Sequence, residues 1–308
     1  MKNYVVDFLR VRGSRSWFER GYYAGFSFAR KASRAVPPGD LIISRDILYK
    51  PGGDPRFHSL DIYSPADKSK PCPVILFVHG GGWRSADKSE PFRVHAIFSL
   101  NLARLGYVVI SANYRLSPKV KHPAHSEDIA DALAWVCKNI HEYNGDPAQV
   151  ILSGHSAGGH IGAFLVTHPE MLIERGIDTN VIRGFVGISG VYEIAGFGRY
   201  FFAREFMIRP GFGDDPEGWI SASPVSATQM LNIPVFYINA QHDTGLEKHT
   251  AAMLHKFPNP SNRSKIYKGS NHFLVLIHET ETESIFSDIH EFLVQNCIRQ
   301  VAIGKNPI

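Results

Sequence analysis

The sequence is poor in cysteine, with only Cys72, Cys137 and Cys297 in 308 residues and no C-x-x-C pair. An odd number of widely separated cysteines argues against a disulfide framework and against a structural zinc site. The fifteen histidines are scattered and contain no H-E-x-x-H sequence, so a zinc-hydrolase motif is also missing. We therefore predict reduced thiols, a cytoplasmic protein, and chemistry that needs neither a metal nor another cofactor.

Long hydrophobic runs and strong net charge are also missing. No stretch approaches the roughly 20 apolar residues of a membrane-spanning helix, and none near Met1 resembles the apolar part of a signal peptide. The net charge of +4 is too small to indicate a nucleic-acid partner. No repeat or linker divides the chain, so we expect one large domain over residues 39–308, preceded by a separate segment, residues 1–38.

Basic side chains are concentrated at the amino end. Residues 1–35 carry eight of them against two acidic side chains, and aromatic residues are interspersed in "SWFERGYYAGFSFARKASR". One interpretation is a helix packed on the body through its aromatic side. The other is a helix that covers the substrate pocket or lies on an anionic membrane, giving a membrane-associated protein. The sequence leaves both interpretations open.

After residue 39, short apolar runs alternate with helical patterns. Residues 41–49 and 57–65 flank a Pro/Gly turn and predict an antiparallel hairpin. Continuous apolar runs predict buried strands at 73–78, 107–112, 149–154, 184–189 and 234–239, with a shorter one at 265–267. Helical patterns occupy 90–104, 125–143, 157–168, 246–257 and 279–299. This alternation predicts an α/β fold class with a mostly parallel sheet flanked by helices.

One segment, residues 190–230, departs from this alternation. It is rich in aromatic residues and glycine, and it is too long to be a structureless loop inside a compact domain. We interpret it as a cap inserted over the carboxyl ends of the strands, where ligands bind to such sheets.

A candidate nucleophile, Ser156, lies between Gly154 and Gly158 in "GHSAG". By chance alone G-x-S-x-G occurs in on the order of one chain in ten of this length. Here a predicted strand leads into the serine and a helical pattern follows it, which is the setting of a nucleophile elbow. The two glycines would avoid steric clashes in this tight turn, and Gly159 would allow the helix to approach its neighbours closely.

A glycine run after the strand at 73–78 is the candidate oxyanion site. "HGGGW" begins at His79, and glycines allow backbone N–H groups to approach a developing negative oxygen without obstruction by side chains. We predict that the N–H groups of Gly81 and Gly82, with that of Ala157, form the oxyanion hole. Trp83 either borders the pocket or belongs to the core.

The nucleophile also needs a base and an acid. Asp243 and His272 follow predicted strands and lie in the order serine, acid, histidine that this architecture requires. The alternatives are Glu247 for the acid and His242 or His278 for the base. We predict Asp243 and His272.

Four stretches together resemble the α/β-hydrolase fold, and within it the esterases related to hormone-sensitive lipase, the isoprenylcysteine methylesterases and the arylformamidases. These stretches are "HGGGW", "ANYRLSP…HPAHSEDIADALAWV", "NGDPAQVILSGHSAGGH", and the pair Asp243 and His272. The chain differs from hormone-sensitive lipase relatives at His155, where an aspartate is usual, and from plant methylesterases in having no transmembrane segment. We interpret the second stretch as structural, with Glu127 and Asp128 complementing a helix dipole.

The combined prediction is a serine carboxylesterase that acts on a small-molecule ester. The resemblance also leaves open an arylformamidase or amidase, which would use the same triad. A non-catalytic receptor of the same fold is a further alternative, although such proteins typically lose the nucleophile or the histidine.

Overall fold

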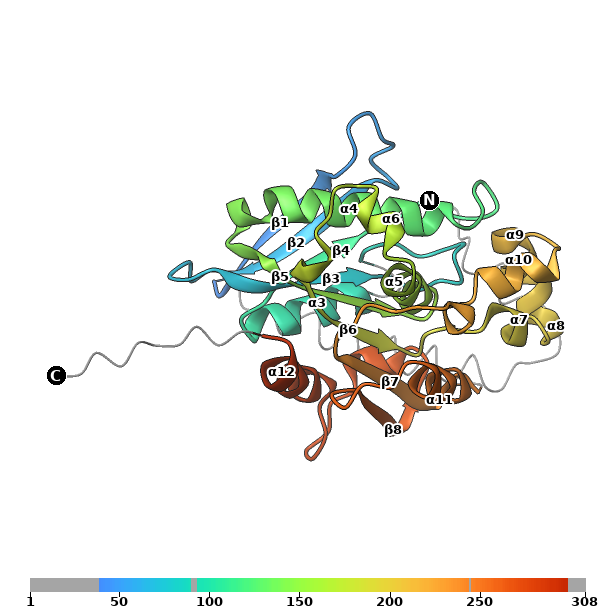
Figure 1. Ribbon diagram of the computed structural model, residues 1–308. Coiled ribbons are helices and arrows are strands. Elements are labelled where there is room, and N and C mark those ends of the chain that lie inside the picture. Colours follow the sequence, from blue (N-terminus) through green and yellow to red (C-terminus); the bar gives the residue numbers. More distant parts are fainter. Residues whose placement is uncertain (1–38, 90–92, 244, 299–308) are drawn as a thin grey trace.

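The computed structural model describes residues 39–89, 93–243 and 245–298. At its centre is an eight-stranded sheet in the order β1-β2-β4-β3-β5-β6-β7-β8 (Figure 1). The strands β1 (Leu41–Leu48) and β2 (Ser59–Pro65) form an antiparallel hairpin, and β2 also pairs antiparallel with β4 (Val108–Ala112). The remaining neighbours pair parallel: β3 (Cys72–Val78), β5 (Gly145–His155), β6 (Ile182–Ile188), β7 (Val235–His242) and β8 (Arg263–Asn271). The predicted mostly parallel sheet is confirmed.

The last strand is longer than the sequence indicated. β8 covers nine residues, whereas only residues 265–267 were predicted. This strand lies at the edge of the sheet, and most of its side chains are exposed or half-buried. It therefore lacks the continuous apolar run by which a buried parallel strand is recognised.

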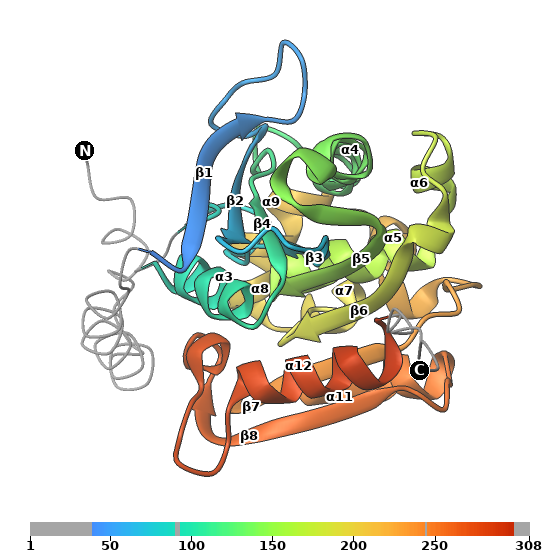
Figure 2. The ribbon, with the colours of Figure 1, turned by 90° about the vertical axis from the view of Figure 1, so that its left-hand side faces the viewer.

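Helices cover both faces of the sheet. The helices α3 (Val94–Arg104) and α12 (Ile285–Asn296) share an apolar core with one face. The helices α4 (Ala124–Asn139), α5 (Ala157–Thr167) and α11 (Leu246–Lys256) pack with the other face. Figure 2 shows α3 and α4 on opposite sides of β3 and β5.

The prediction of a helix over residues 279–299 is wrong at its start. Glu279 pairs with Ser284 as an isolated antiparallel bridge. Within this turn the N–H of Thr280 donates to the carbonyl of Glu283 at 2.8 Å. Because the turn uses these backbone groups, α12 begins only at Ile285.

Residues 190–230 fold into a series of short helical pieces at one end of the molecule (Figure 1). These pieces are α7 (Ile194–Phe197), α8 (Phe201–Ala203), a π-helical turn (Arg204–Ile208), α9 (Arg209–Phe212), α10 (Pro216–Ser221) and a 3₁₀ turn (Pro224–Ser226). The N–H of Val225 donates to the carbonyl of Tyr192 at 3.1 Å, so the two ends of this cap lie side by side. The cap also contacts the loop after β3, because a Cβ on Gly82 would lie 3.2 Å from Sδ of Met207.

The predicted amino-terminal segment, residues 1–38, lies outside the described residues. Within the described ranges, no helix is long and apolar enough to cross a membrane. In the same ranges, no group of three or more His, Cys, Asp or Glu side chains is placed to hold a metal ion.

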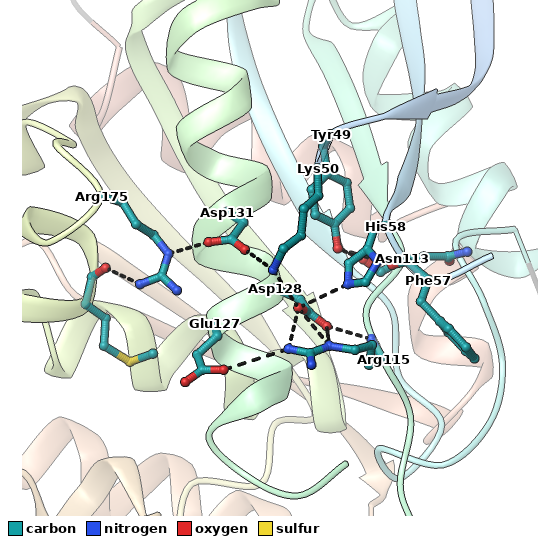
Figure 3. A network of polar contacts seen from close by, with 11 residues as sticks. Tyr49, Lys50, Phe57, His58, Asn113, Arg115, Glu127, Asp128, Asp131 and Arg175 are labelled. Carbon is teal, nitrogen blue, oxygen red and sulfur yellow. Dashed lines mark hydrogen bonds and ion pairs between the residues drawn. The ribbon is translucent and has the colours of Figure 1, made fainter. Parts of the chain in front are cut away.

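An ion pair between the buried carboxylate of Asp128 and the partly exposed guanidinium of Arg115 joins α4 to the residues after β4 (Figure 3). The carboxylate of Asp128 is fully buried and accepts hydrogen bonds from Nε and Nη2 of Arg115 at 2.7 and 2.8 Å. It also accepts the backbone N–H of Arg115 at 2.9 Å, and Nε2 of His58 lies 3.4 Å away. The helix-dipole interpretation is therefore incomplete for Asp128, because its main partner is a guanidinium from another element.

A second set of ion pairs extends this network along α4. Asp131 contacts Nζ of Lys50 at 2.7 Å and Nε of Arg175 at 2.6 Å. Burial alone would raise the pKa of Asp131, but these two hydrogen-bonded cations lower it below its usual value. Together the two carboxylates connect α4 to the loop after β1 and to the segment after α6 (Glu170–Ile173) (Figure 3).

Asp128→Ala should lower the free energy of unfolding by about 3 kcal/mol, because it leaves the Arg115 guanidinium without its buried partner. Urea denaturation followed by circular dichroism measures the loss. The matched control is Glu127→Ala, since Glu127 lies 3.8 Å from the same guanidinium and is 43% exposed. It should cost no more than about 1 kcal/mol. Equal losses in the two variants would contradict this interpretation.

Candidate active site

Ser156 occupies a tight turn between β5 and α5. Its backbone angles are φ 55° and ψ −117°, a conformation that non-glycine residues rarely adopt. Such a conformation costs about 1–3 kcal/mol and persists only where the surroundings hold it. Here the N–H of Ser156 donates to the carbonyl of Ile188 at 2.9 Å, and its carbonyl accepts the N–H of His160 at 3.0 Å. The predicted elbow geometry is therefore present.

The glycines around Ser156 are required by close backbone contacts. A Cβ on Gly154 would lie 2.3 Å from the carbonyl oxygen of Gly158. A Cβ on Gly158 would lie 2.1 Å from the carbonyl oxygen of Val78, at the end of β3. Any side chain at these two positions would push β3, β5 and α5 apart.

The structure brings Ser156, His272 and Asp243 together in one row. Nε2 of His272 lies 2.9 Å from Oγ of Ser156, and Nδ1 lies 2.7 Å from Oδ1 of Asp243. A carboxylate only accepts hydrogen bonds, so Nδ1 must carry the proton. Nε2 then offers its lone pair to the Ser156 hydroxyl, which is the arrangement of a base facing a nucleophile.

Asp243 is held as a buried anion. Its Oδ2 accepts hydrogen bonds from Nδ2 of Asn239 at 2.9 Å and from the N–H of Ala240 at 3.2 Å. Burial by itself would raise its pKa. The hydrogen bond and charge of His272, with the hydrogen bond from Asn239, instead lower the pKa to about 2. The carboxyl is therefore ionised at every pH at which the protein would work.

The alternative acid and bases lie elsewhere. Glu247 is in the first turn of α11, and His242 is exposed at the end of β7. Nε2 of His278 lies 3.7 Å from the carboxylate of Glu283. Among the described histidines, His272 is the one that lies within hydrogen-bonding distance of Oγ of Ser156.

The glycine run lies directly beside Ser156. A Cβ on Gly80 would be 3.1 Å from Cβ of Ser156, and Gly81 and Gly82 both have positive φ angles, 113° and 61°. Nδ1 of His79 lies 2.7 Å from the carbonyl oxygen of Gly80. In a trans peptide the N–H of Gly81 points away from that carbonyl, so this contact fixes the direction of one predicted oxyanion donor.

A further donor is available at the start of α5. Ala157 is its first residue, and the first N–H groups of a helix have no acceptor within the helix. The amino end of the helix dipole also favours negative charge at this position. Ala157, which directly follows Ser156, is therefore a candidate donor, as are the N–H groups of the glycine run beside Ser156.

The loop that carries the glycine run is tied to the residues after β4. The hydroxyl of Tyr114 donates to the carbonyl of His79 at 3.0 Å, and the N–H of Ser117 donates to the carbonyl of Trp83 at 2.8 Å. Oδ1 of Asn113 accepts the N–H of Lys88 at 2.6 Å. The Arg115–Asp128 ion pair lies within this same stretch. The ion pair therefore stabilises the residues that hold the candidate oxyanion loop.

Trp83 belongs to the core rather than to an open pocket. It is fully buried and makes edge contacts with Phe212 and His160, with ring centroids 4.8 and 5.2 Å apart. Through these contacts it packs the glycine loop against the cap and α5.

Sequence reasoning missed Asn239 and His155 as parts of the site. Asn239 is a polar residue within an otherwise apolar strand, four positions before Asp243, and that placement was the available signal. His155 was noted only as a difference from related esterases. Its contact with residue 272 depends on the fold and has no signal in the local sequence.

A sequence profile of the BD-FAE family matches residues 60–256, which is more than half of the chain. The chain belongs to the BD-FAE family. The matched region includes Ser156 and Asp243, whereas His272 lies beyond its end. The motif-based resemblance to esterases is thereby confirmed at the level of the family.

Curated relatives agree with this assignment. The chain is 30% identical to Esterase LipQ of Mycobacterium tuberculosis over 64% of this chain and 48% of that protein. It is 34% identical to the probable isoprenylcysteine alpha-carbonyl methylesterase ICME of Oryza sativa subsp. japonica over 60% of this chain and 41% of that protein. The chain thus spans about half the length of the curated relatives it matches.

Solved structures confirm the fold. Esterase B from Lactobacillus rhamnosis superimposes with a TM-score of 0.72 at 19% identity, covering 90% of this chain and 92% of that one. The esterase from Pyrobaculum calidifontis gives a TM-score of 0.65 at 24% identity, covering 84% and 85% of the two chains. At such identities the likeness establishes the α/β-hydrolase fold and not the reaction of this BD-FAE family member.

Three buried histidines should make the protein acid-sensitive. Burial lowers the pKa of His79 and His160 to about 3 and that of His125 to about 4. In the unfolded chain they titrate near 6.5. A histidine whose folded pKa is lowered contributes stability above the unfolded pKa and loses it as the pH falls toward the folded one. Together the three should remove about 3 kcal/mol between pH 6.5 and 5.5.

Urea midpoints measured at pH 8.5, 7.5, 6.5 and 5.5 test this expectation. The profile should be nearly flat above pH 7.5 and steep below pH 6.5. Replacing His125 by Gln removes one titrating group and should make the acid slope shallower by about 1 kcal/mol per pH unit. An unchanged slope in that variant would contradict the assignment.

Proposed function

We propose that the protein is a serine hydrolase that cleaves carboxylic esters through an acyl-enzyme. The observation that carries the proposal is the continuous contact from Asp243 through His272 to Ser156, with distances of 2.7 and 2.9 Å. The glycine run beside Ser156 supports it, because acyl transfer needs backbone donors at that place. Family membership and the esterase names of the relatives support the same reaction class.

In the first half of the reaction Oγ of Ser156 attacks the ester carbonyl carbon, and Nε2 of His272 takes the hydroxyl proton. The carbonyl oxygen becomes an oxyanion, which the N–H groups of Gly81, Gly82 and Ala157 stabilise. The carbon–oxygen bond to the alcohol then breaks, and Nε2 gives its proton to the leaving alcohol. Asp243 stabilises the imidazolium throughout and keeps its own charge.

In the second half a water molecule repeats the sequence. His272 removes a proton from the water, and the resulting hydroxide attacks the acyl carbon. Oγ of Ser156 leaves and recovers the proton from Nε2. The products are a carboxylic acid and free enzyme, so the cycle balances with water as the only co-reactant and without a cofactor.

The cap favours esters with small or medium acyl or aryl groups. Met207 from its π-helical turn lies against Gly82, one of the proposed oxyanion donors. The hydroxyl of Tyr200 lies 3.6 Å from the Cβ position of Gly245, close to the acid. Side chains from residues 190–230 thus approach both the glycine run and the residues after Asp243, which supports a preference for the smaller acyl and aryl groups.

A cytoplasmic location and a membrane contact through residues 1–35 also remain part of the proposal. The three cysteines are free thiols, which fits a reducing compartment. Sedimentation with anionic vesicles, using the full chain and a chain without residues 1–36, tests the membrane contact. Equal sedimentation of the two forms would contradict it.

Ser156→Ala should abolish hydrolysis of p-nitrophenyl acetate, with a loss of more than about 10³-fold in kcat, because no other group takes over the attack. Ser287→Ala, an exposed serine on α12, is the control and should keep full activity. The wild type should also react with a fluorophosphonate probe at Ser156. Faster turnover of an aryl formamide than of the ester would instead favour an amidase.

Asp243→Asn should lower kcat by up to about 10⁴-fold, because an amide in this position favours the wrong tautomer of the histidine. Glu247→Gln is the matched control and should retain activity within about twofold. A loss of tenfold or less in Asp243→Asn would show that the acid has been assigned wrongly.

A further inference from the structure

His155 is a buried histidine that the proposed reaction does not use. It is the last residue of β5, immediately before Ser156, and it is 2% exposed. Its ring lies beside that of His272, with centroids 4.8 Å apart and planes at 43°. His155 therefore contacts the candidate base His272, although it takes part in none of the triad hydrogen bonds.

The contact is a hydrogen bond to the main chain. Nε2 of His155 lies 2.7 Å from the carbonyl oxygen of His272. A carbonyl only accepts, so Nε2 must carry a proton. Burial, together with the nearby histidines His272 and His95, holds the pKa of His155 well below its ordinary value, so the ring is neutral and Nδ1 has no proton.

The other side of the ring faces the glycine loop. A Cβ on Gly80 would lie 2.8 Å from Nδ1 of His155, and among the described residues this nitrogen has no hydrogen-bond partner. The ring thus packs between the candidate oxyanion loop and the loop that carries His272. It cannot shift toward one loop without opening space at the other.

This position matters because His272 lies just beyond the end of a strand. β8 ends at Asn271, and a 3₁₀ turn follows at Leu274–Ile277. Strand pairing aligns β8 with β7, since His242 is opposite Asn271, and this sets the base relative to the acid. The nucleophile is on β5, and β6 lies between β5 and β7. Strand pairing therefore does not set the distance from the base to the nucleophile directly.

We propose that His155 is a positioning residue that fixes the backbone of His272 relative to the elbow. Two consecutive residues of the elbow then hold residue 272 at two points: Ser156 contacts its imidazole, and His155 holds its carbonyl. This two-point attachment sets the direction in which Nε2 of His272 faces the nucleophile. His155 touches no reacting atom, and it acts only through His272. The inference rests on the proposed function.

Two amide substitutions of different reach test the proposal. Gln places its side-chain amide near the position of Nε2 of the histidine and can still donate to the carbonyl of His272, whereas Asn is too short to do so. For p-nitrophenyl acetate, His155→Gln should keep kcat within about threefold. His155→Asn should lower kcat up to about 100-fold with little change in KM, as expected when a base is misplaced by about 1 Å.

The rate of fluorophosphonate labelling of Ser156 should follow the same order. His290→Asn is the matched control, because His290 also has a hydrogen-bonding ring nitrogen, 2.9 Å from the hydroxyl of Tyr107, but lies on α12. It should keep full activity. If His155→Asn does not fold, His155→Leu, which is close in volume and has no donor, carries the same expectation.

Equal kcat values of the Gln and Asn variants would overturn the proposal. It would also be overturned if both variants lost activity and both had lowered urea midpoints, because the loss would then follow from lower stability. The proposed function fails separately. If the wild type labels at Ser156 but hydrolyses no ester, the ester assignment is wrong, while the labelling rates of the variants still test the role of His155.

Discussion

The backbone conformation of Ser156 is the constraint on which the candidate site depends. A φ of 55° at a serine is unfavourable, and it is maintained by the hydrogen bond to Ile188 on one side and the start of α5 on the other. The turn is possible only because Gly154 and Gly158 let three backbone segments come together. The same close packing places Ser156, the first N–H of α5 and the glycine run at the carboxyl ends of the neighbouring strands β3 and β5.

Around this turn, the site is assembled from two kinds of support. Strand pairing aligns Asp243 with His272, because their strands are neighbours. Side-chain contacts hold the loops that strand pairing does not align. Asn113, Tyr114 and Ser117 hold the glycine loop, and the Arg115–Asp128 ion pair fixes the stretch that carries them (Figure 3). These polar contacts outside the candidate triad therefore keep the loop after β3 in one conformation.

Much of this could be predicted from the sequence because parallel strands and tight turns have local signatures. The apolar runs placed the buried strands, and the glycines around Ser156 indicated the elbow. The start of α12 and the length of β8 could not be predicted in this way, because the first depends on a turn at Glu279–Ser284 and the second on an edge strand with polar side chains. Likewise the contact between His155 and residue 272 joins positions that only the fold brings together.

The place at which the cap enters the chain has a consequence for how this fold can diversify. Residues 190–230 lie between β6 and β7, contain none of the three triad residues, and leave and re-enter the body at adjacent points joined by the Tyr192–Val225 hydrogen bond. A segment with neighbouring ends can be replaced by one of another length without moving the strands it connects. Residues 190–230 and the strands that carry the candidate triad are thus separable stretches, and grafting a foreign segment in place of residues 190–230 requires only that its two ends lie close together.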